Sequence, residues 1–282
     1  MSDNELGLFL RTRREALTPA EAGLPPGSRR RTTGLRRSEV ATLAGVSVEY
    51  VTRLEQGRDR HPSPQVLSAL AGALRLSGHE RIHLHRLTKA PGPGFNCRGE
   101  SAPAETIRPA VQAILDRLEP TPAVLLNRLN DMVAYTDGFG RLARPAGLLD
   151  GERPNFARFV FTDARAREVF PDWDHVADDQ VATLKQGPFR IDRHVAGLAD
   201  ELTVTAGEAF TARVASLPGL PKPSGVIRFQ HPDVGPLRLA YETLELPADD
   251  DQRLLIYVPA DAATTAALDD LNWQRAPLRL VS

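Results

Sequence analysis

The chain has 282 residues, of which 41% are hydrophobic, so it is long enough for two domains that each bury a core. The formal net charge of −1 hides an asymmetry, because residues 1–100 hold 16 Arg/Lys against 10 Asp/Glu and residues 101–282 hold 19 against 26. There is no basic-then-apolar leader and no apolar run near 20 residues, so we expect neither secretion nor a membrane span. The single cysteine, Cys97, excludes an internal disulfide and indicates a reducing cytoplasm.

The first two segments are a helix and a long loop. Residues 4–17 have the apolar spacing of an amphipathic helix, with Leu6, Phe9 and Leu10 on its buried side. Residues 18–37 hold several prolines and glycines, which favour a loop rather than a helix. Arginines gather in and directly after this loop: Arg29, Arg30, Arg31, Arg36 and Arg37.

Residues 37–57, R-S-E-V-A-T-L-A-G-V-S-V-E-Y-V-T-R-L-E-Q-G, have the pattern of a helix-turn-helix. Gly45 stands where the first helix must end, since glycine enters the left-handed region without a Cβ penalty. Ser47 can cap the second helix, whose Val51 and Leu54 would be buried. The first helix carries its own apolar set: Val40, Ala41, Leu43 and Ala44. Such a motif places its second helix in the major groove of DNA. The alternative is a helical hairpin inside a larger fold.

Two more helices complete a five-helix, all-α domain over residues 1–89. Ser63-Pro64 is a good helix start, and a fifth helix over 78–89 presents Ile82, Leu84 and Leu87 as its apolar face. Its histidines lack the cysteines or carboxylates that would complete a metal site, so we expect no metal. Residues 90–106 are rich in proline and glycine and are expected to be a linker.

The expected DNA interface has two parts. Base edges would be read from the exposed side of the second helix, where Glu49 suits cytosine N4, Arg53 suits guanine and Val48 suits a thymine methyl. Arginines near the motif would bind phosphates, and the basic charge of this half agrees with that role. The predicted DNA-binding residues are Arg29, Arg30, Arg31, Arg36, Arg37, Ser47, Val48, Glu49, Thr52, Arg53 and Arg58. Alternatively, Glu49 and Arg53 pair with each other at their i, i+4 spacing.

Residues 107–282 predict an α+β domain. A helix over about 108–118 precedes two strands that meet at a tight turn at Asn130-Asp131, and helices are expected over 155–186 and 195–217. Strands return at V-I-R-F-Q, P-L-R-L-A-Y-E-T-L and R-L-L-I-Y-V-P, before a closing helix over 262–271. A five-stranded antiparallel sheet with helices over one face resembles a PAS-type sensor domain.

Longer strings resemble a known family of bacterial regulators. F-L-R-T-R-R-E, G-L-R-R-S-E-V-A-T-L-A-G-V-S and P-S-P-Q-V-L-S-A-L are similar to Cro/repressor-type (xenobiotic-response-element family) helix-turn-helix domains. N-F-A-R-F-V-F, D-W-D-H-V-A and H-P-D-V-G-P-L-R-L-A-Y-E-T-L resemble the MmyB-like ligand-binding domain. The resemblance implies a PAS-like sensor for fatty-acid-like ligands. The chain departs from it at Tyr135-Thr136, where relatives usually carry Trp-Asn, and at Val214, where they usually carry Trp. We therefore expect a ligand that is larger than that of the relatives, or a different one.

The expected ligand-binding residues are mostly aromatic, because small-molecule pockets are largely apolar with a few polar groups. They are Leu125, Tyr135, Phe139, Phe156, Arg158, Phe159, Trp173, Phe210, Val214, Phe229 and Tyr241. An ordinary hydrophobic core is the alternative for each of the apolar ones. Arg158 would clamp a carboxylate of the ligand, or else form a structural ion pair with a residue such as Glu201. His231 is expected to be a satisfied turn histidine.

These patterns predict a cytoplasmic, ligand-responsive transcription regulator that binds double-stranded DNA and a small apolar or amphipathic ligand. No nucleotide-binding loop, nucleophile elbow or H-E-x-x-H motif occurs, so we expect no cofactor and no catalysis. One recognition helix reads only a few base pairs, which favours a homodimer on a pseudo-palindrome. Two alternatives remain open, namely an enzyme fused to a DNA-binding head and a protein-interaction module that needs no ligand.

Overall fold

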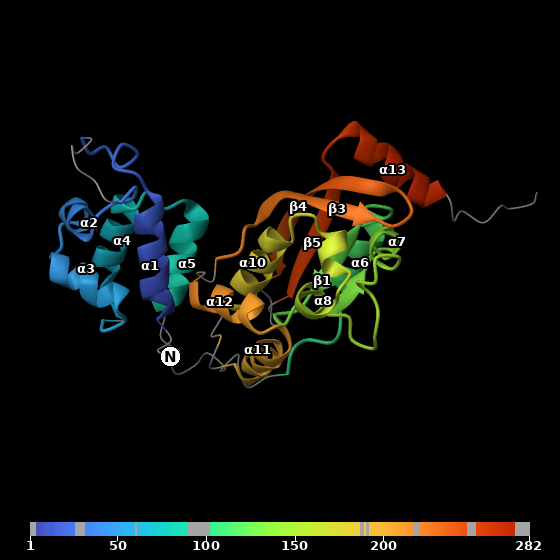
Figure 1. Ribbon diagram of the computed structural model, residues 1–282, viewed down its shortest axis with the longest axis horizontal. Helices are drawn as coiled ribbons and strands as arrows, with labels where there is room; N and C mark the ends of the chain where they lie inside the picture. Colours follow the sequence, from blue (N-terminus) through green and yellow to red (C-terminus); the bar gives the residue numbers. More distant parts are fainter. Residues whose placement is uncertain are drawn as a thin grey trace, which may run out of the picture. The chain divides into compact units, whose positions relative to one another are not determined.

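The computed structural model describes residues 4–25, 32–59, 61–88, 102–186, 189, 192–216, 220–246 and 252–273. The chain divides into two compact units, the first built on helices α1–α5 and the second on the later elements (Figure 1). Most of the segment 90–106 lies outside the described residues, so the position of the domain boundary within it stays a prediction.

The first unit is all helical in its described part. Its helices are α1 (Glu5–Ala16), α2 (Arg37–Ala44), α3 (Val48–Glu55), α4 (Pro64–Ala73) and α5 (Gly78–Thr88). The predicted start and stop signals act as expected: Gly45 ends α2 with φ of 65°, and the hydroxyl of Ser47 accepts a hydrogen bond from the amide of Tyr50 at 3.1 Å. Pro64 occupies the first turn of α4 behind the Ser63 cap.

Two predicted apolar faces are partly wrong. Leu43 of α2 and Ile82 of α5 are exposed, at 38% and 55% of their surface, whereas we expected both to be buried. In α5 the buried position is taken by His83, whose ring packs edge-on against Phe9 of α1 with centroids 5.0 Å apart. Periodicity gives a helix a buried side, but the neighbouring helices decide where that side begins and ends.

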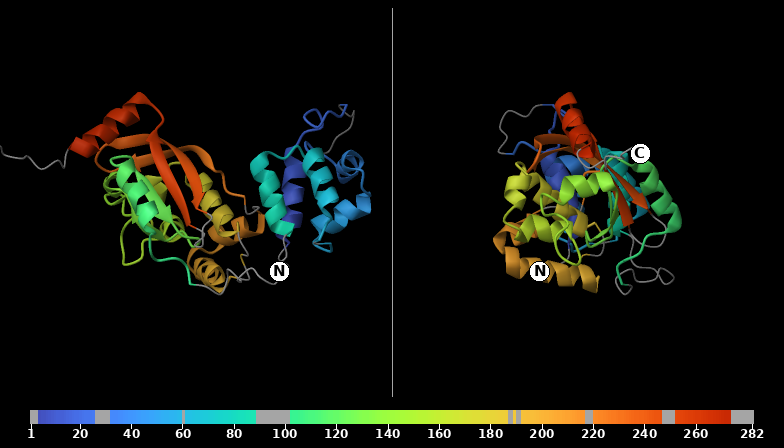
Figure 2. Two further views of the ribbon diagram at one scale, coloured as in Figure 1. Left: turned by 180° about the vertical axis from the view of Figure 1, so that it is seen from behind. Right: turned by 90° about the vertical axis from the view of Figure 1, so that its right-hand side faces the viewer.

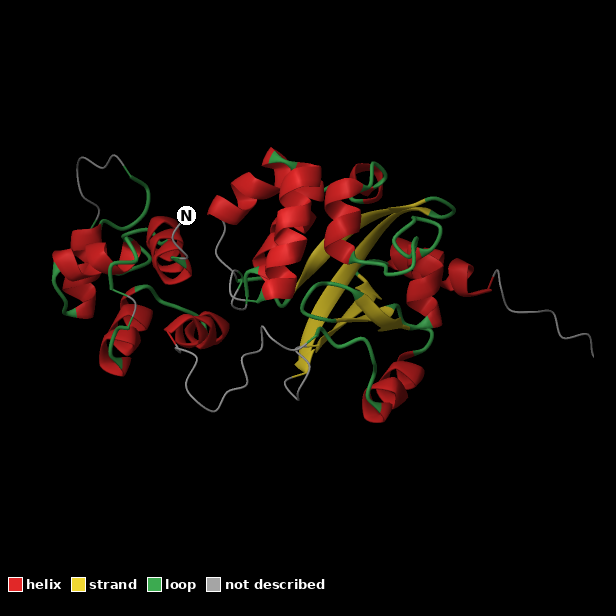
Figure 3. Ribbon diagram, turned by 90° about the horizontal axis from the view of Figure 1, so that it is seen from below, coloured by secondary structure: helices red, strands yellow, loops and turns green. Residues whose placement is uncertain are grey.

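The second unit combines helices with one sheet (Figure 3). Its strands are β1 (Ala123–Leu126), β2 (Met132–Tyr135), β3 (Ser224–His231), β4 (Gly235–Leu246) and β5 (Gln252–Pro259). Its helices are α6 (Pro109–Leu118), α7 (Asp137–Ala143), α8 (Phe156–Thr162), α9 (Ala166–Val169), α10 (Trp173–Leu184), α11 (Arg193–Ala206), α12 (Glu208–Ser216) and α13 (Ala262–Trp273). Gly207, with φ of 58°, stands between α11 and α12 where we expected one continuous helix.

The five strands form one antiparallel sheet in the order β2-β1-β5-β4-β3. The predicted hairpin between β3 and β4 is present, and His231 pairs with Gly235 at its end. Alternation along β3 and β4 also agrees with the prediction, since Phe229, Leu237 and Leu239 are buried while Arg228 and Arg238 are exposed.

Helices cover both faces of the sheet, whereas we expected them on one. One face carries the main core, which packs α7, α8, α9, α10 and α13 against the strands. The other face is covered over β1 and β5 by α6 (Figure 2). Val111 and Leu115 of α6 pack there on Leu125 and Leu254. The outer part of this second face is open, with Val226, Leu244 and Val258 exposed.

Candidate nucleic-acid interface and ligand-binding domain

The second helix of the helix-turn-helix motif presents a solvent-facing side. Val51 and Leu54 of α3 are buried in the core of the first unit, while Val48, Glu49 and Arg53 on the opposite side are exposed. Ser47 is also exposed, although its hydroxyl is used as the helix cap. The side chains that we expected to read base edges are therefore accessible within this unit.

Two of these side chains have contacts that the sequence did not predict. The guanidinium of Arg53 lies over the ring of Tyr50, 5.4 Å from its centroid, and within the described part of the chain no ion pair joins it to Glu49. The hydroxyl of Thr52 donates to the carbonyl of Val48 at 2.8 Å, inside the helix itself. Thr52 is only half exposed, so its hydroxyl reaches a base only if that bond is exchanged.

The predicted phosphate-binding arginines have three different settings. Arg36 and Arg58 are exposed, and the backbone amide of Arg36 donates to Glu39 at 2.7 Å. Arg37 is exposed too, but its Nε donates to the carboxylate of Glu55 at 2.8 Å. Arg29, Arg30 and Arg31 lie outside the described residues.

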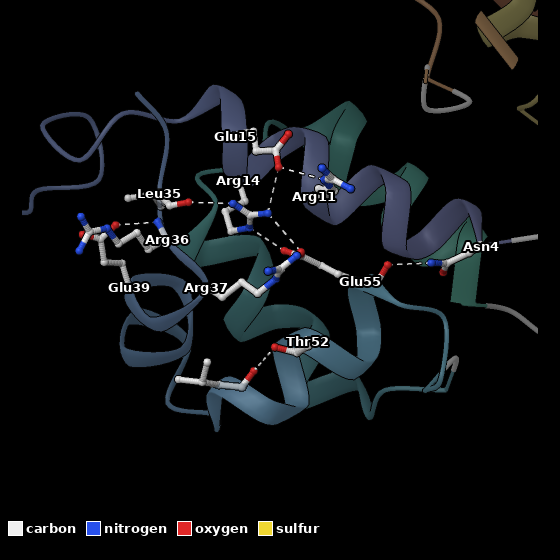
Figure 4. A network of polar contacts seen from close by, with 11 residues as sticks. Asn4, Arg11, Arg14, Glu15, Leu35, Arg36, Arg37, Glu39, Thr52 and Glu55 are labelled. Carbon is white, nitrogen blue, oxygen red and sulfur yellow. Dashed lines mark hydrogen bonds and ion pairs between the residues drawn. The ribbon is translucent and has the colours of Figure 1, made fainter. Parts of the chain in front are cut away.

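A buried polar network holds the end of α3 to its neighbours (Figure 4). The carboxylate of Glu55 accepts from Nε and Nη2 of Arg14, at 2.6 and 3.1 Å, and Nη1 of Arg14 donates to the carbonyl of Leu35 at 2.9 Å. The amide of the Asn4 side chain donates to the backbone carbonyl of Glu55 at 2.8 Å. These bonds fix the recognition helix to α1 and to the segment before α2.

The backbones of α1, α3 and the segment before α2 also approach each other closely around this network. A Cβ on Gly7 of α1 would lie 2.5 Å from the carbonyl oxygen of Glu55, so only glycine lets the two helices approach this closely. A Cβ on Gly34 would meet the backbone of Glu15 at 2.2 Å, which brings the arginine-bearing loop against α1. The position of α3 is therefore set by tight packing as well as by ion pairs.

In the second unit, most of the predicted pocket residues belong to one aromatic layer between the helices and the sheet. Phe156 and Phe159 of α8 both contact Phe170, which in turn meets Phe229 of β3 edge-on at 5.6 Å. Phe139 stacks on Tyr257 of β5, and Phe210 reaches the layer through Phe161. The residues of the predicted set that are buried in this layer are Phe139, Phe156, Phe159, Trp173, Phe210 and Phe229.

Three of the predicted pocket residues lie elsewhere. Leu125 is buried, but on the reverse face of β1 against α6, because successive side chains of a strand point to opposite faces. Tyr135 is partly exposed at the end of β2, where its ring contacts Phe139 and its hydroxyl accepts from Arg144 at 3.2 Å. Val214 is half buried, and its carbonyl accepts from the buried ammonium of Lys185 at 2.7 Å.

Arg158 forms the ion pair with Glu201 that was the alternative to binding a carboxylate of the ligand. Its Nε and Nη2 donate to the two carboxylate oxygens of Glu201 at 2.8 and 2.9 Å, and this bond holds the pKa of Glu201 below its usual range. His231 is a satisfied turn histidine, since its Nδ1 accepts from the amide of Asp233 at 3.1 Å. Both side chains are committed to bonds within the protein.

One polar pair in the aromatic layer was not predicted. The hydroxyl of Tyr241 on β4 donates to the carboxylate of Asp179 on α10 at 3.4 Å. Burial raises the pKa of Asp179, and burial together with this carboxylate raises the pKa of Tyr241. Asp179 lies one turn along α10 from the buried Val176, but α10 also carries Asp174 and Asp178, so the sequence does not show which of the three carboxylates is buried.

Two other kinds of site are absent from the described residues. They hold no group of three or more His, Cys, Asp or Glu side chains placed to hold a metal ion. They also hold no helix with the length and apolar character needed to cross a membrane.

An exposed second helix in an all-helical unit defines a helix-turn-helix protein, and an α+β unit with an aromatic core follows it. A helix-turn-helix domain model matches residues 5–84, and the model of the MmyB-like transcription regulator ligand binding domain matches residues 107–271. The chain therefore belongs to the family of MmyB-like transcription regulators. No curated protein matches it.

Proposed function

We propose that the protein is a transcription regulator whose first domain reads DNA through Val48, Glu49 and Arg53 of α3. The exposure of these side chains at the free side of the recognition helix supports the assignment. Arg36, Arg37 and Arg58 on the described surface, together with Arg29, Arg30 and Arg31, would bind phosphates and provide salt-dependent affinity. Arg53 lies over the ring of Tyr50, which restricts its side chain before DNA arrives.

The second domain would sense a small amphipathic ligand of fatty-acid-like character in its PAS-like fold. Three observations support this: the family match, the order and antiparallel pairing of the five strands, and the aromatic layer around Phe170. The residues with the best placement for such a ligand are Phe139, Phe156, Phe159, Trp173, Phe210, Phe229 and Tyr241. The domain would bind its ligand without turning it over.

A homodimer on a pseudo-palindromic operator would complete the system, because a single recognition helix contacts only a few base pairs. A ligand that binds one arrangement of the dimer more tightly than another would then change the affinity for DNA by at most the ratio of its affinities for the two arrangements.

The test combines DNA selection with ligand recovery. Selection from a random duplex library with the full chain should return a pseudo-palindrome, and Arg53→Ala should lose about 1–3 kcal/mol of discrimination at one base pair of each half-site. Equal weakening on selected and random DNA would remove Arg53 from base reading. Native mass spectrometry and thermal-shift assays with saturated fatty acids should show a bound amphiphile. If neither method detects one, the sensory assignment fails while the DNA assignment stands.

A further inference from the structure

The carboxylate of Glu55 holds two guanidinium groups, and they differ in their surroundings. Arg14 is buried and bonds to both carboxylate oxygens, so it satisfies the charge of Glu55 inside the unit. Arg37 keeps 43% of its side chain exposed, whereas the side chain of Glu55 is only 2% exposed. The second cation is therefore not needed to neutralise the buried carboxylate.

The bond between Arg37 and Glu55 uses one edge of the guanidinium. Only Nε of Arg37 donates to Glu55, at 2.8 Å, and in the described part of the chain its two terminal amino groups bond to no other group. A guanidinium is planar and rigid, so anchoring Nε also fixes the direction of the amino groups. Figure 4 shows Arg37 approaching Glu55 from α2 while Arg14 approaches it from α1.

The side chains around Glu55 carry a net charge of +1, which one bound anion would neutralise. Arg11, Arg14 and Arg37 carry three positive charges against the two negative charges of Glu15 and Glu55, and Glu15 pairs with both Arg11 and Arg14, so the cluster keeps one positive charge in excess. A phosphate oxygen at the amino groups of Arg37 would restore neutrality through a charge-assisted hydrogen bond.

We infer that Glu55 is a positioning residue for DNA binding, which aims the terminal amino groups of Arg37 at a backbone phosphate. Because Glu55 is the last residue of α3, the same side chain links this phosphate contact to the helix that reads the bases. The eight residues of α3 span about 12 Å at 1.5 Å per residue, so the network fixes how far the phosphate lies from the bases read at Val48 and Glu49. This inference rests on the proposed DNA binding.

The experiment measures affinity of the full-length protein for a random-sequence DNA duplex as a function of salt. Arg37→Gln should lower the slope of log K against log salt by about 0.9 per bound protomer, and weaken binding about fivefold at 0.15 M salt. Arg37→Lys should lose nearly as much, because an ammonium lacks the fixed fork that bonds Glu55 at one edge and phosphate at the other.

Arg11→Gln is the matched control. Arg11 also donates through Nε to one carboxylate, that of Glu15 at 2.9 Å, and this pair is exposed on both sides. Glu15 accepts from Nη2 of Arg14 as well, at 3.2 Å, but in the described residues neither Arg11 nor Glu15 bonds to Arg37 or Glu55. Its slope should equal that of the unchanged protein. Circular dichroism on every variant shows whether the first domain remains folded.

Two outcomes would overturn the inference. An unchanged slope for folded Arg37→Gln would mean that Arg37 is purely structural, and full affinity with an unchanged slope for Arg37→Lys would mean that Glu55 does not direct it. If the unchanged protein itself shows no salt-dependent DNA binding, the proposed function fails instead, so the two failures are distinguishable.

Discussion

Arg14 and Glu55, 41 residues apart in the sequence, form a two-point ion pair between the first helix and the end of the recognition helix. Both side chains are almost fully buried, at 9% and 2% exposure. Removing Arg14 leaves the buried carboxylate of Glu55 with the partly exposed Arg37 as its one remaining ion-pair partner among the described residues, which lowers the compensation of a charge in a place that water does not reach.

We therefore expect Arg14→Met to destabilise the first domain by about 3 kcal/mol. Denaturant unfolding followed by far-ultraviolet circular dichroism measures the loss, while the fluorescence of Trp173 and Trp273, the only tryptophans in the chain, reports the second domain separately. Arg11→Met, in an exposed pair, should cost less than about 1 kcal/mol. Equal midpoints for the two variants would show that burial adds nothing to the Arg14 pair.

At Gly45, in the turn between α2 and α3, the effect of a substitution on stability should come from the backbone conformation and not from side-chain contacts. A Cβ on Gly45 would meet nothing within 4 Å, yet its φ of 65° is unfavourable for alanine, so Gly45→Ala should cost about 1–2 kcal/mol from the backbone alone. Gly72 inside α4 is equally uncrowded and is helical, so Gly72→Ala should gain about 1 kcal/mol. The same chemical change should move the unfolding midpoint in opposite directions, and a shared sign would contradict this account of the turn.

Asp179 gives a pH-dependent prediction in the second domain. Burial raises its pKa in the folded state above the ordinary aspartate value of 3.8, so ionisation costs stability at pH values above the folded pKa. Asp179→Asn should raise the free energy of unfolding at pH 7, and the gain should fade as the pH drops through the folded pKa and below 3.8, where both states of the aspartate are protonated.

Tryptophan fluorescence during denaturant unfolding at pH 3.5, 5 and 7 measures this effect. Asp178→Asn is the control, because the neighbouring Asp178 bonds to Arg213 at 2.8 Å and remains accessible to solvent. If Asp179→Asn raises the free energy of unfolding equally at all three pH values, the titration of the Asp179 carboxyl is not the cause of the stabilisation.

Substitutions in the Arg158–Glu201 pair test whether Arg158 has a structural role or binds the ligand. A double-mutant cycle with Arg158→Ala and Glu201→Ala should give a coupling energy below about 1 kcal/mol, since both side chains are about 40% exposed. Neither variant should change the amphiphile recovered with the protein. Loss of the ligand in Arg158→Ala alone would restore Arg158 to the binding site.

Local signals predicted most elements of the fold. Gly45, Ser47 and Ser63-Pro64 act where a helix must end or begin, and the alternation along β3 and β4 depends only on strand geometry. These features require no knowledge of distant residues, so a single sequence contains them.

The features that were missed depend on contacts between distant segments. His83, and not Ile82, lies on the buried side of α5, because its ring packs edge-on against Phe9 of α1. Alternation shows that Leu125 and Val124 face opposite ways, but only the position of α6 decides which of the two faces the aromatic layer. Likewise, nothing near Glu55 in the sequence indicates that Arg14 and Arg37 meet there.

Strand β1 has Val124 and Leu126 in the aromatic layer and Ala123 and Leu125 against α6 on its reverse side. A molecule that pushes on the aromatic side therefore moves a strand whose back carries the first helix after the inter-domain segment. Tight packing transmits such a displacement rather than absorbing it. Under the proposed function, a ligand bound on the aromatic side would therefore shift α6 through β1, so α6 is the helix whose hydrogen exchange should respond to the ligand.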